Sequence, residues 1–263
     1  MLAAGERLVP RPTGTGRPPV AGARVLVPPN FEPVVAVIVE QIANLKEHDE
    51  WEIKMGIETQ SGFESGLTKQ QLKRIITWAN AECERKDSGL VSTGKWQETS
   101  DLHYQNNIRV TVFQDAGDGT APKKQIAIRK LRESDVDITV MDHPITIRSS
   151  VKREIPAVVQ FVENPDPVRL KKRLSYEYRG CIRIDITLVW QGRSEGEARA
   201  NPSKHEIELE FIDRGVLHTQ GARWAALSML LKVVYLIHQA YETDCDFERT
   251  LLVPSLMRRH DEK

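Results

Sequence analysis

Three glutamates alternate with apolar residues in the segment KHEIELEF, residues 204–211. Side chains of a strand point alternately to its two faces, so Glu206, Glu208 and Glu210 would share one face. Carboxylates about 7 Å apart, two residues of strand rise, repel one another unless cations, basic side chains or water neutralise them. The pattern therefore indicates either the solvated face of an antiparallel sheet or a cluster able to bind a divalent cation, which prefers oxygen ligands.

Charged residues recur at every second position in other segments of the chain. The residues that share the polar face are Glu50, Glu52 and Lys54 in EWEIKMG, Arg109 and Thr111 in IRVTVF, Lys130 and Arg132 in QIAIRKLR, Arg148, Ser150, Lys152 and Glu154 in IRSSVKREI, Arg169, Lys171 and Arg173 in VRLKKRLSYEY, and Arg183, Asp185 and Thr187 in CIRIDITLVW. Acids concentrate in the first and last of these segments, and bases between them. Because runs of like charge are unfavourable on an exposed strand, this distribution favours a common interior.

Three helices with apolar faces are predicted to cover the opposite faces of these strands. They span residues 33–48, 67–83 and 222–242, and Thr68 with Gln71 forms a capping box at the start of the second. If the helices pack outside, the charged faces point inward, and a closed sheet of about eight strands encloses a ligand-sized lumen. The sequence thus predicts an α+β fold: an eight-stranded antiparallel β-barrel with a charged lumen, covered outside by α-helices.

Length and composition limit the alternatives. The 263 residues, 40% of them hydrophobic, suffice for one large domain, and we expect a flexible Pro/Gly/Arg-rich tail at 1–30 followed by a single domain at 31–263. Basic and acidic residues number 37 each, which argues against a broad electrostatic footprint for nucleic acid. The 3 cysteines form no CxxC pair and no segment has the pattern of a membrane span, so we expect a soluble intracellular protein.

A lumen that holds both a carboxylate cluster and a set of Arg and Lys side chains suits a polyphosphate bound with a divalent metal. Magnesium is held by one or two carboxylates and bridges to substrate phosphate, while Arg and Lys bind the remaining phosphate oxygens. Transfer of a terminal phosphoryl group to water depends mainly on positioning and charge neutralisation, with one carboxylate left to orient the attacking water. The pattern therefore favours metal-assisted phosphoanhydride hydrolysis.

Five motifs in order resemble the metal-dependent mRNA 5′-triphosphatases of fungi and protozoa, members of the triphosphate tunnel metalloenzyme superfamily. They are Glu-x-Glu-x-Lys-x-Gly at 50–56, a looser Arg-x-Ser-x-x-x-Glu at 148–154, Arg-x-Lys-x-Arg at 169–173, Arg-x-Asp-x-Thr at 183–187 and Glu-x-Glu-x-Glu at 206–210. The resemblance implies an eight-stranded tunnel that hydrolyses the γ-phosphate of 5′-triphosphate RNA with Mg²⁺ or Mn²⁺, the first step of mRNA capping, and hence a nuclear location. The compact core is most similar to the protozoan members.

The resemblance also implies a role for each matched residue. Glu50, Glu52 and Glu210 would hold the metal, and Glu154 would orient the nucleophilic water. The residues that would bind the γ-phosphate are Lys171, Arg173 and Arg109, with Lys130 assisting, and those that would support this shell are Arg169, Arg183, Asp185, Thr187, Glu206 and Glu208. The matches of Arg109 and Lys130 depend on order and spacing alone.

Two other functions fit the same strands. Tunnel enzymes that cleave tripolyphosphate or other small triphosphates usually begin with the Glu-x-Glu-x-Lys motif, whereas a tail and a helix precede it here. A non-catalytic polyphosphate-binding barrel would need the bases but not the complete acidic cluster. We also expect manganese-dependent hydrolysis of nucleoside triphosphates, because no base-recognition motif is visible. The Trp-containing peptide with which fungal members dock on the guanylyltransferase is not seen, since the first tryptophan is Trp51, so any association with that partner would need another contact.

Overall fold

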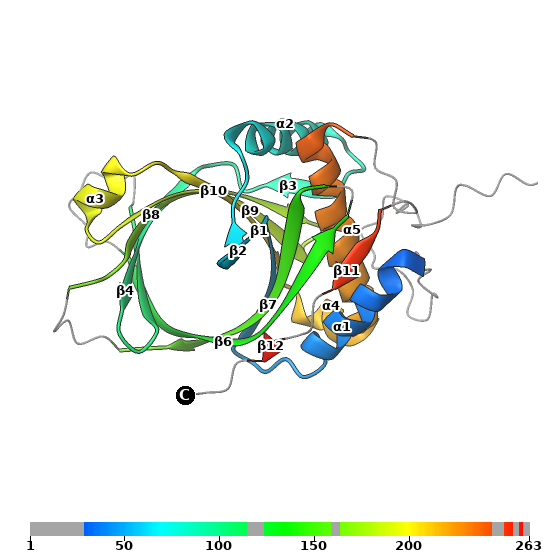
Figure 1. The fold of residues 1–263 in the computed structure, drawn as a ribbon, viewed down its shortest axis with the longest axis horizontal. Helices are drawn as coiled ribbons and strands as arrows, with labels where there is room; N and C mark the ends of the chain where they lie inside the picture. Colours follow the sequence, from blue (N-terminus) through cyan, green and yellow to red (C-terminus); the bar gives the residue numbers. More distant parts are fainter. Residues whose placement is uncertain are drawn as a thin grey trace, which may run out of the picture.

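The computed structural model describes residues 29–114, 124–141, 143–158, 164–243, 250–254 and 258–259. Antiparallel strands of this part form a closed ring (Figure 1). In order around the ring they are β1 (Asp49–Thr59), β10 (Lys204–Phe211), β9 (Ile182–Gly192), β8 (Val168–Tyr178), β4 (Gln97–Tyr104), β5 (Ile108–Phe113), β6 (Gln125–Val140) and β7 (Ile145–Pro156), which pairs with β1 again. The predicted eight-stranded antiparallel barrel is therefore confirmed.

Pairing between the first and last of the predicted strands closes the ring. Glu52 of β1 lies opposite Glu210 of β10, and Lys54 lies opposite Glu208. On its other edge β1 pairs with β7, where Glu52 lies opposite Ser150. Because the register is fixed on both edges, the side chains at 50, 52 and 54 point into the lumen, and the buried side chains at 51, 53 and 55 point out.

Helices cover the outer face of one half of the ring (Figure 1). They are α1 (Glu32–Ile42), α2 (Lys69–Glu84), α4 (Arg214–Gln220) and α5 (Ala222–Tyr241), while the short α3 (Glu195–Ala200) lies against β8 and β9. Helix α5 is apolar on most of its surface because it packs against the other three helices as well as against β1 and β10. The hydrophobic core is thus the layer between these helices and the outer side chains of the strands, among them Trp51, Ile53, Ile147 and Ile184.

The remaining elements are short. They are a 3-10 helix (Pro29–Phe31), β2 (Gly62–Ser65), β3 (Leu90–Ser92), β11 (Leu252–Pro254) and β12 (Arg258–Arg259). Strands β11 and β12 both pair with β6, and β2 forms a hairpin with the end of β1. The β1–β2 hairpin reaches the inner side of the ring, as shown below.

A small polar contact ties β1 to β7 and α1 inside the apolar layer. The indole Nε1 of Trp51 donates to Ser149 Oγ at 2.9 Å, and the Ser149 hydroxyl donates to Gln41 Oε1 at 2.5 Å. Gln41 Nε2 in turn donates to the Ser149 carbonyl oxygen at 3.1 Å. Buried polar groups cost free energy unless they are paired, so this contact holds Trp51, and with it the flanking Glu50 and Glu52, in one register.

The structure corrects several expectations about the elements. Strand β4 is not among the predicted strands, because its sequence QETSDLHY lacks alternation of apolar and polar residues. Strand β6 continues to Val140, well past the predicted segment QIAIRKLR, residues 125–132, through a bulge between Arg132 and Ser134. The first predicted helix, 33–48, ends at Ile42.

The other helix predictions agree with the structure. The capping box is present, since the Thr68 amide donates to Gln71 Oε1 at 2.9 Å and the Gln71 amide donates to Thr68 Oγ1 at 3.3 Å. The predicted tail lies outside the described residues up to residue 28, so the domain boundary at 31 stays a prediction. Within the described ranges, no helix combines the length and the hydropathy needed to span a membrane.

Candidate active site

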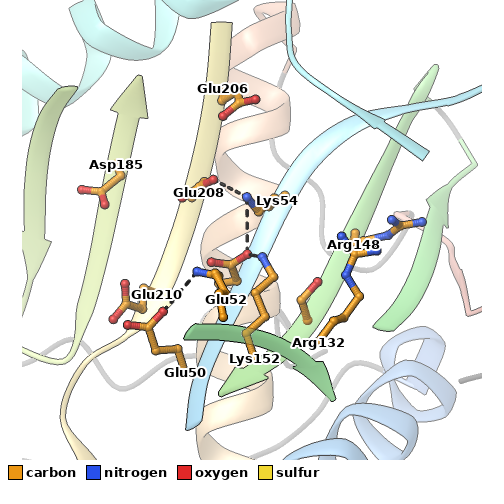
Figure 2. Close-up of polar contacts among 12 residues, drawn as sticks. Glu50, Glu52, Lys54, Arg132, Arg148, Lys152, Asp185, Glu206, Glu208 and Glu210 are labelled. Atoms are coloured by element: carbon orange, nitrogen blue, oxygen red, sulfur yellow. Dashed lines mark hydrogen bonds and ion pairs between the residues drawn. The ribbon is translucent and has the colours of Figure 1, made fainter. Parts of the chain in front are cut away.

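Carboxylates of β1 and β10 form one wall of the lumen, and buried lysines hold them (Figure 2). Lys54 Nζ contacts Glu208 and lies 3.4 Å from Glu52 Oε1, while Lys152 of β7 reaches Glu52 from the other side. Glu52 and Lys152 are only 5% and 7% exposed. Burial raises the pKa of Glu208, but Lys54 and Lys171 outweigh it and hold that pKa well below its usual range. This carboxylate is therefore charged and fully compensated.

Two other carboxyl groups of the same wall lack such compensation. Burial, together with the nearby carboxylates Glu154 and Glu210, raises the pKa of Glu50 to about 7. Burial also raises the pKa of Glu210, although Arg183 contacts it. Neighbouring carboxyl groups whose pKa values are raised mark a place where negative charge lacks a cation.

Glu154 of β7 lies between two bases and beside this pair. Lys130 Nζ contacts Glu154 Oε1 and lies 3.6 Å from Glu50 Oε2. Arg109 Nη2 lies 3.2 and 3.4 Å from the two Glu154 oxygens. Burial raises the pKa of Glu154, but the opposing effect of Lys130 and Arg109 is larger. The pKa of Glu154 therefore lies below its ordinary value. Glu154 is thus an ionised hydrogen-bond acceptor inside the lumen.

Strand β8 supplies a row of bases on the opposite wall, and each base has an acidic partner. The nitrogen–oxygen distances are 2.8 and 3.0 Å from Arg169 to Glu206, 2.5 Å from Lys171 to Asp101, and 3.1 Å from Arg173 to Asp185. Burial lowers the pKa of Lys171 to about 8, although the Asp101 carboxylate opposes the shift. The row is therefore pre-oriented by neighbouring strands, and its lysine is cationic at neutral pH.

Several buried polar atoms of the lumen make no hydrogen bond in the described part of the chain. They are Nε of Arg109, Arg169 and Arg183, Oγ1 of Thr187 and Nε2 of His103. An unpaired buried polar atom costs about 1–3 kcal/mol, so a group of them on one surface indicates a site that a ligand or water completes. Phosphate oxygens are strong acceptors that suit guanidinium and hydroxyl donors.

Glu50, Glu52 and Glu210 are the carboxylates of this wall that could hold a cation. All offer oxygen ligands, which hard divalent ions prefer, and Glu52 and Glu210 are direct partners in the ladder. Among the described residues, no three acidic, His or Cys side chains already surround a common point, because Lys152 and Arg183 hold Glu52 and Glu210. The residues fit a divalent cation because they are carboxylates and lie close together. Cation binding would replace the ion pairs with Lys152 and Arg183 by contacts to the metal.

Every site residue predicted from the sequence lies on the inner face of the ring, as the strand registers show. The predicted supporting residues pair with their neighbours: Arg183 contacts Glu210 and lies 3.3 Å from Asp185 Oδ2, and Ser175 donates to Asp185 Oδ1 at 2.5 Å. Thr187 is the exception, since its buried hydroxyl has no hydrogen-bond partner within the described ranges. The roles of all these residues stay proposals, whereas their gathering in one lumen is observed.

Sequence reasoning assigned no role to several other lumen residues. Asp101 and His103 lie on β4, whose sequence gives no strand signal. Asp135 and Asp137 follow the bulge in β6, which shifts the alternation by one residue. Lys152 is different, because it shares the alternation of Ser150 and Glu154 and could have been assigned from that signal. The oversight matters because Asp101 and Lys152 are the direct partners of Lys171 and Glu52.

Comparison with known proteins adds a family to this geometry. The family model described as mRNA capping enzyme, beta chain, matches residues 41–229. The S. pombe Pct1 RNA triphosphatase is similar in structure, with a TM-score of 0.64 and 20% identity over 85% of this chain and 99% of that chain. A Mimivirus capping enzyme triphosphatase is also similar, with a TM-score of 0.50 and 18% identity over 79% of this chain and 96% of that chain. At such identities these structures show the shared fold. No curated protein sequence gives a match.

Proposed function

The chain belongs to the family of mRNA capping enzyme beta chains, and on that premise we propose how its tunnel hydrolyses the γ-phosphate of 5′-triphosphate RNA. It is an mRNA 5′-triphosphatase, which yields a 5′-diphosphate end and orthophosphate in the first step of capping. One observation supports the assignment of the lumen as the active site. Two neighbouring carboxyl groups with raised pKa values, Glu50 and Glu210, share one closed ring with Arg109 and Arg169, whose buried Nε donors have no hydrogen-bond partner among the described residues.

We propose that Glu50, Glu52 and Glu210 hold the divalent cation on which the family depends. Such a cation would neutralise negative charge on the phosphate oxygens of the substrate. The raised pKa values of Glu50 and Glu210 support this placement, because a cation is what would relieve their repulsion. We propose Mg²⁺ or Mn²⁺, since both accept carboxylate oxygens and bind phosphate.

The γ-phosphate would be bound by Lys171, Arg173 and Arg109, with Lys130 beside them. Lys171 is cationic at pH values below its pKa of about 8. The buried Nε of Arg109 makes no hydrogen bond within the described residues, so it can donate to a phosphate oxygen. Charge-assisted hydrogen bonds of this kind stabilise the charge that spreads over the phosphoryl oxygens during transfer. Burial in the lumen strengthens them, because few waters compete for the same donors.

Glu154 would orient the attacking water. Its carboxylate is ionised because Lys130 and Arg109 lower its pKa, so it can accept a hydrogen bond from water beside the γ-phosphate. The residues that would keep this arrangement in place are Arg169, Arg183, Asp185, Glu206 and Glu208, through the ion pairs described above, and Thr187, whose buried hydroxyl lies among them. Lys152 and Asp101 join this supporting group, since each pairs with a residue that would bind metal or phosphate.

We extend the proposal to substrates, partners and location. Because the contacts of the lumen suit phosphate, manganese should also support hydrolysis of free nucleoside triphosphates with little base selectivity. Capping acts on nascent transcripts, so we propose that the protein works in the nucleus. Pct1 forms a complex with the Spt5 CTD, and we propose for this chain only that any capping partner binds outside the tunnel.

The decisive experiment measures orthophosphate release from triphosphate-ended RNA, with magnesium present or chelated, for the intact protein and two variants. Glu52→Ala should reduce release at least about a hundred-fold, the usual cost of losing one electrostatic contact to the transition state. The matched control is Glu98→Ala, which removes an exposed carboxylate of the same barrel, 3.1 Å from Lys172, and should leave release unchanged.

The outcomes separate the alternatives. Release that needs metal and is lost only in Glu52→Ala supports the proposal. Release from tripolyphosphate but not from RNA would indicate a hydrolase of small triphosphates instead. Tight polyphosphate binding without any release would indicate a binding barrel and contradict the assigned chemistry.

A further inference from the structure

The β1–β2 hairpin, residues 56–65, folds over one end of the lumen. Strand β2 continues the sheet on the side of β1 where β10 lies, as the 2.6 Å ion pair between Glu64 and Lys204 of β10 shows. The Phe63 ring nevertheless contacts Arg148 of β7, on the other side of β1, with the guanidinium carbon 4.5 Å from the ring centroid. The Phe63 side chain therefore crosses the inner face of β1, and Figure 1 shows β2 within the outline of the ring.

Gly56 makes this crossing possible. It lies two residues after Lys54, so a side chain at this position would point into the lumen. A Cβ atom there would lie 2.2 Å from the Glu64 carbonyl oxygen and 2.8 Å from Phe63 Cζ, which is closer than such atoms can approach. The glycine that ends the motif at 50–56 is thus explained by the hairpin that passes over it.

The end of the lumen beside the hairpin, here called the hairpin mouth and defined by Phe63 and Arg148, differs in chemistry from the rest of the lumen. Arg148 donates to both carboxylate oxygens of Asp137, through Nε at 2.6 Å and Nη2 at 2.8 Å, so its charge is neutralised and its orientation is fixed. The Phe63 ring is partly buried against it. An aromatic ring beside a neutralised guanidinium suits a flat, uncharged group such as a nucleobase, which stacks on both, more than it suits another phosphate.

The proposed hydrolysis sets the direction in which the substrate runs. Glu154 and Arg148 both face the lumen from β7, and six residues of strand at ~3.3 Å each separate them by about 20 Å. In phosphoryl transfer the attacking and leaving oxygens are roughly in line. If Glu154 orients the water, the leaving β-phosphate lies on the far side of the γ-phosphate from Glu154. The remainder of the substrate then extends toward Arg148 and the hairpin.

We propose that the first nucleoside of the RNA binds at the hairpin mouth, with its base against Phe63 and Arg148, and that the RNA chain leaves the tunnel there. This inference rests on the proposed function and adds a nucleoside site to a tunnel whose other contacts suit phosphate. Phe63 is a positioning residue, because it touches the base and not the reacting atoms. Stacking is tolerant of base identity, which agrees with the expected lack of selectivity among nucleotides.

The test compares substrates with and without a nucleoside. Phe63→Ala and Phe63→Leu should raise KM for triphosphate-ended RNA and for nucleoside triphosphates roughly five- to hundred-fold, the range expected for a lost base–aromatic stack. Phe63→Tyr keeps the ring and should restore KM to within about two-fold of the intact protein. The affinity for tripolyphosphate, measured as KM if it is cleaved and as an inhibition constant if it is not, should stay unchanged in all three variants.

A purely structural role for Phe63 predicts a different pattern. Loss of hairpin packing would weaken tripolyphosphate and RNA alike, or would be rescued by Leu as well as by Tyr, and either result overturns the nucleoside site. Unchanged KM for RNA in Phe63→Ala overturns it too. If the intact protein releases no phosphate from RNA, the proposed function fails first, so the two failures are distinguishable.

A photocrosslink gives an independent answer. RNA that carries 4-thiouridine as its triphosphate-bearing first nucleotide should form adducts within residues 57–65 on irradiation. Adducts on residues 45–49 would place the nucleoside at the other end, because His48 accepts a backbone hydrogen bond from Glu154 there. That result would reverse the direction of the substrate and overturn the proposal.

Discussion

The two faces of the same barrel strand are stabilised differently: the outer face by apolar packing and the inner face by charge pairing. On β1, Trp51 and Ile53 are at most 1% exposed beneath the helices, and the one polar group among them is hydrogen-bonded. Between them, Glu52 faces the lumen and depends on lysines from its own and a neighbouring strand. The outer face is complete without a ligand, whereas the inner face keeps unpaired donors and carboxyl groups with raised pKa values. Substitutions one residue apart should therefore separate stability from catalysis.

The largest expected effect is on the inner face, at Arg173. Its guanidinium lies 3.1 Å from Asp185 Oδ2, and Arg183 lies 3.3 Å from the same oxygen, so Asp185 keeps a partner when Arg173 is removed. Arg173→Ala should reduce kcat about 10²–10³-fold while the melting temperature changes little. Steady-state kinetics and thermal unfolding on the same preparation measure both. A large drop in melting temperature would show that the lumen also carries the stability of the barrel.

The matching substitution on the outer face is Ile53→Ala. Ile53 is fully buried under the helices and lies opposite Leu209 of β10. Removing its side chain from a packed core should lower the free energy of unfolding by about 2–5 kcal/mol, and the milder Ile53→Val by about 0.5–1.5 kcal/mol. Urea unfolding gives the stability, and kcat per folded molecule should match that of the intact protein. A kcat that falls with the size of the truncation would mean that the two faces are coupled.

The covered and uncovered halves of the ring explain how much of the fold the sequence could predict. Strands β1, β9 and β10 lie under helices, so their outward residues are apolar and the alternation with charged inner residues is visible. Strand β4 lies on the side away from α1, α2, α4 and α5 (Figure 1). Leu102 packs outward against a small apolar cluster that includes Ala198 of α3, but Glu98 and Ser100 occupy outward positions as well, so apolar and polar residues do not alternate. The sequence of β4 therefore does not predict a strand, and without that strand Asp101 could not be predicted as a lumen residue.

A residue of the candidate site could be predicted where its position in the lumen follows from alternation along a strand. It could not be predicted where its position depends on contacts between distant parts of the chain. Glu50, Glu52 and Glu210 share strand faces that any reading of the sequence can list. The bulge of β6 shifts the alternation by one residue, so Asp135 and Asp137 could not be placed by counting. The contact between Phe63 and Arg148 depends on a hairpin that crosses a strand, and no periodicity encodes such a crossing.

A pH profile tests whether the basic wall depends on its acidic partners. Burial lowers the pKa of Lys171 to about 8, so the ammonium group is present below that pH and is lost as the pH rises through it. Because the charged form binds phosphate, kcat/KM should be flat near neutrality and fall by about ten-fold per pH unit above 8. Asp101 raises the pKa of Lys171, so Asp101→Asn should move the fall to lower pH. A profile that is flat to pH 9.5 in both proteins would show that Lys171 stays charged for another reason.

A modest effect is expected at the polar contact that joins Trp51, Ser149 and Gln41 on the outer face. Ser149→Ala leaves the Trp51 indole N–H and the Gln41 side-chain oxygen without their partner, which should cost about 1–3 kcal/mol of unfolding free energy. The control Thr219→Ala removes an exposed helix hydroxyl that donates to the Gly215 carbonyl and should cost much less. Trp51 stands between Glu50 and Glu52, so activity is the informative readout. Unchanged kcat in Ser149→Ala would show that the backbone pairing of β1 with β7 and β10 is enough to keep Glu50 and Glu52 in place. A lower kcat would show that a contact on the outer face of the barrel also positions these two carboxylates on the inner face.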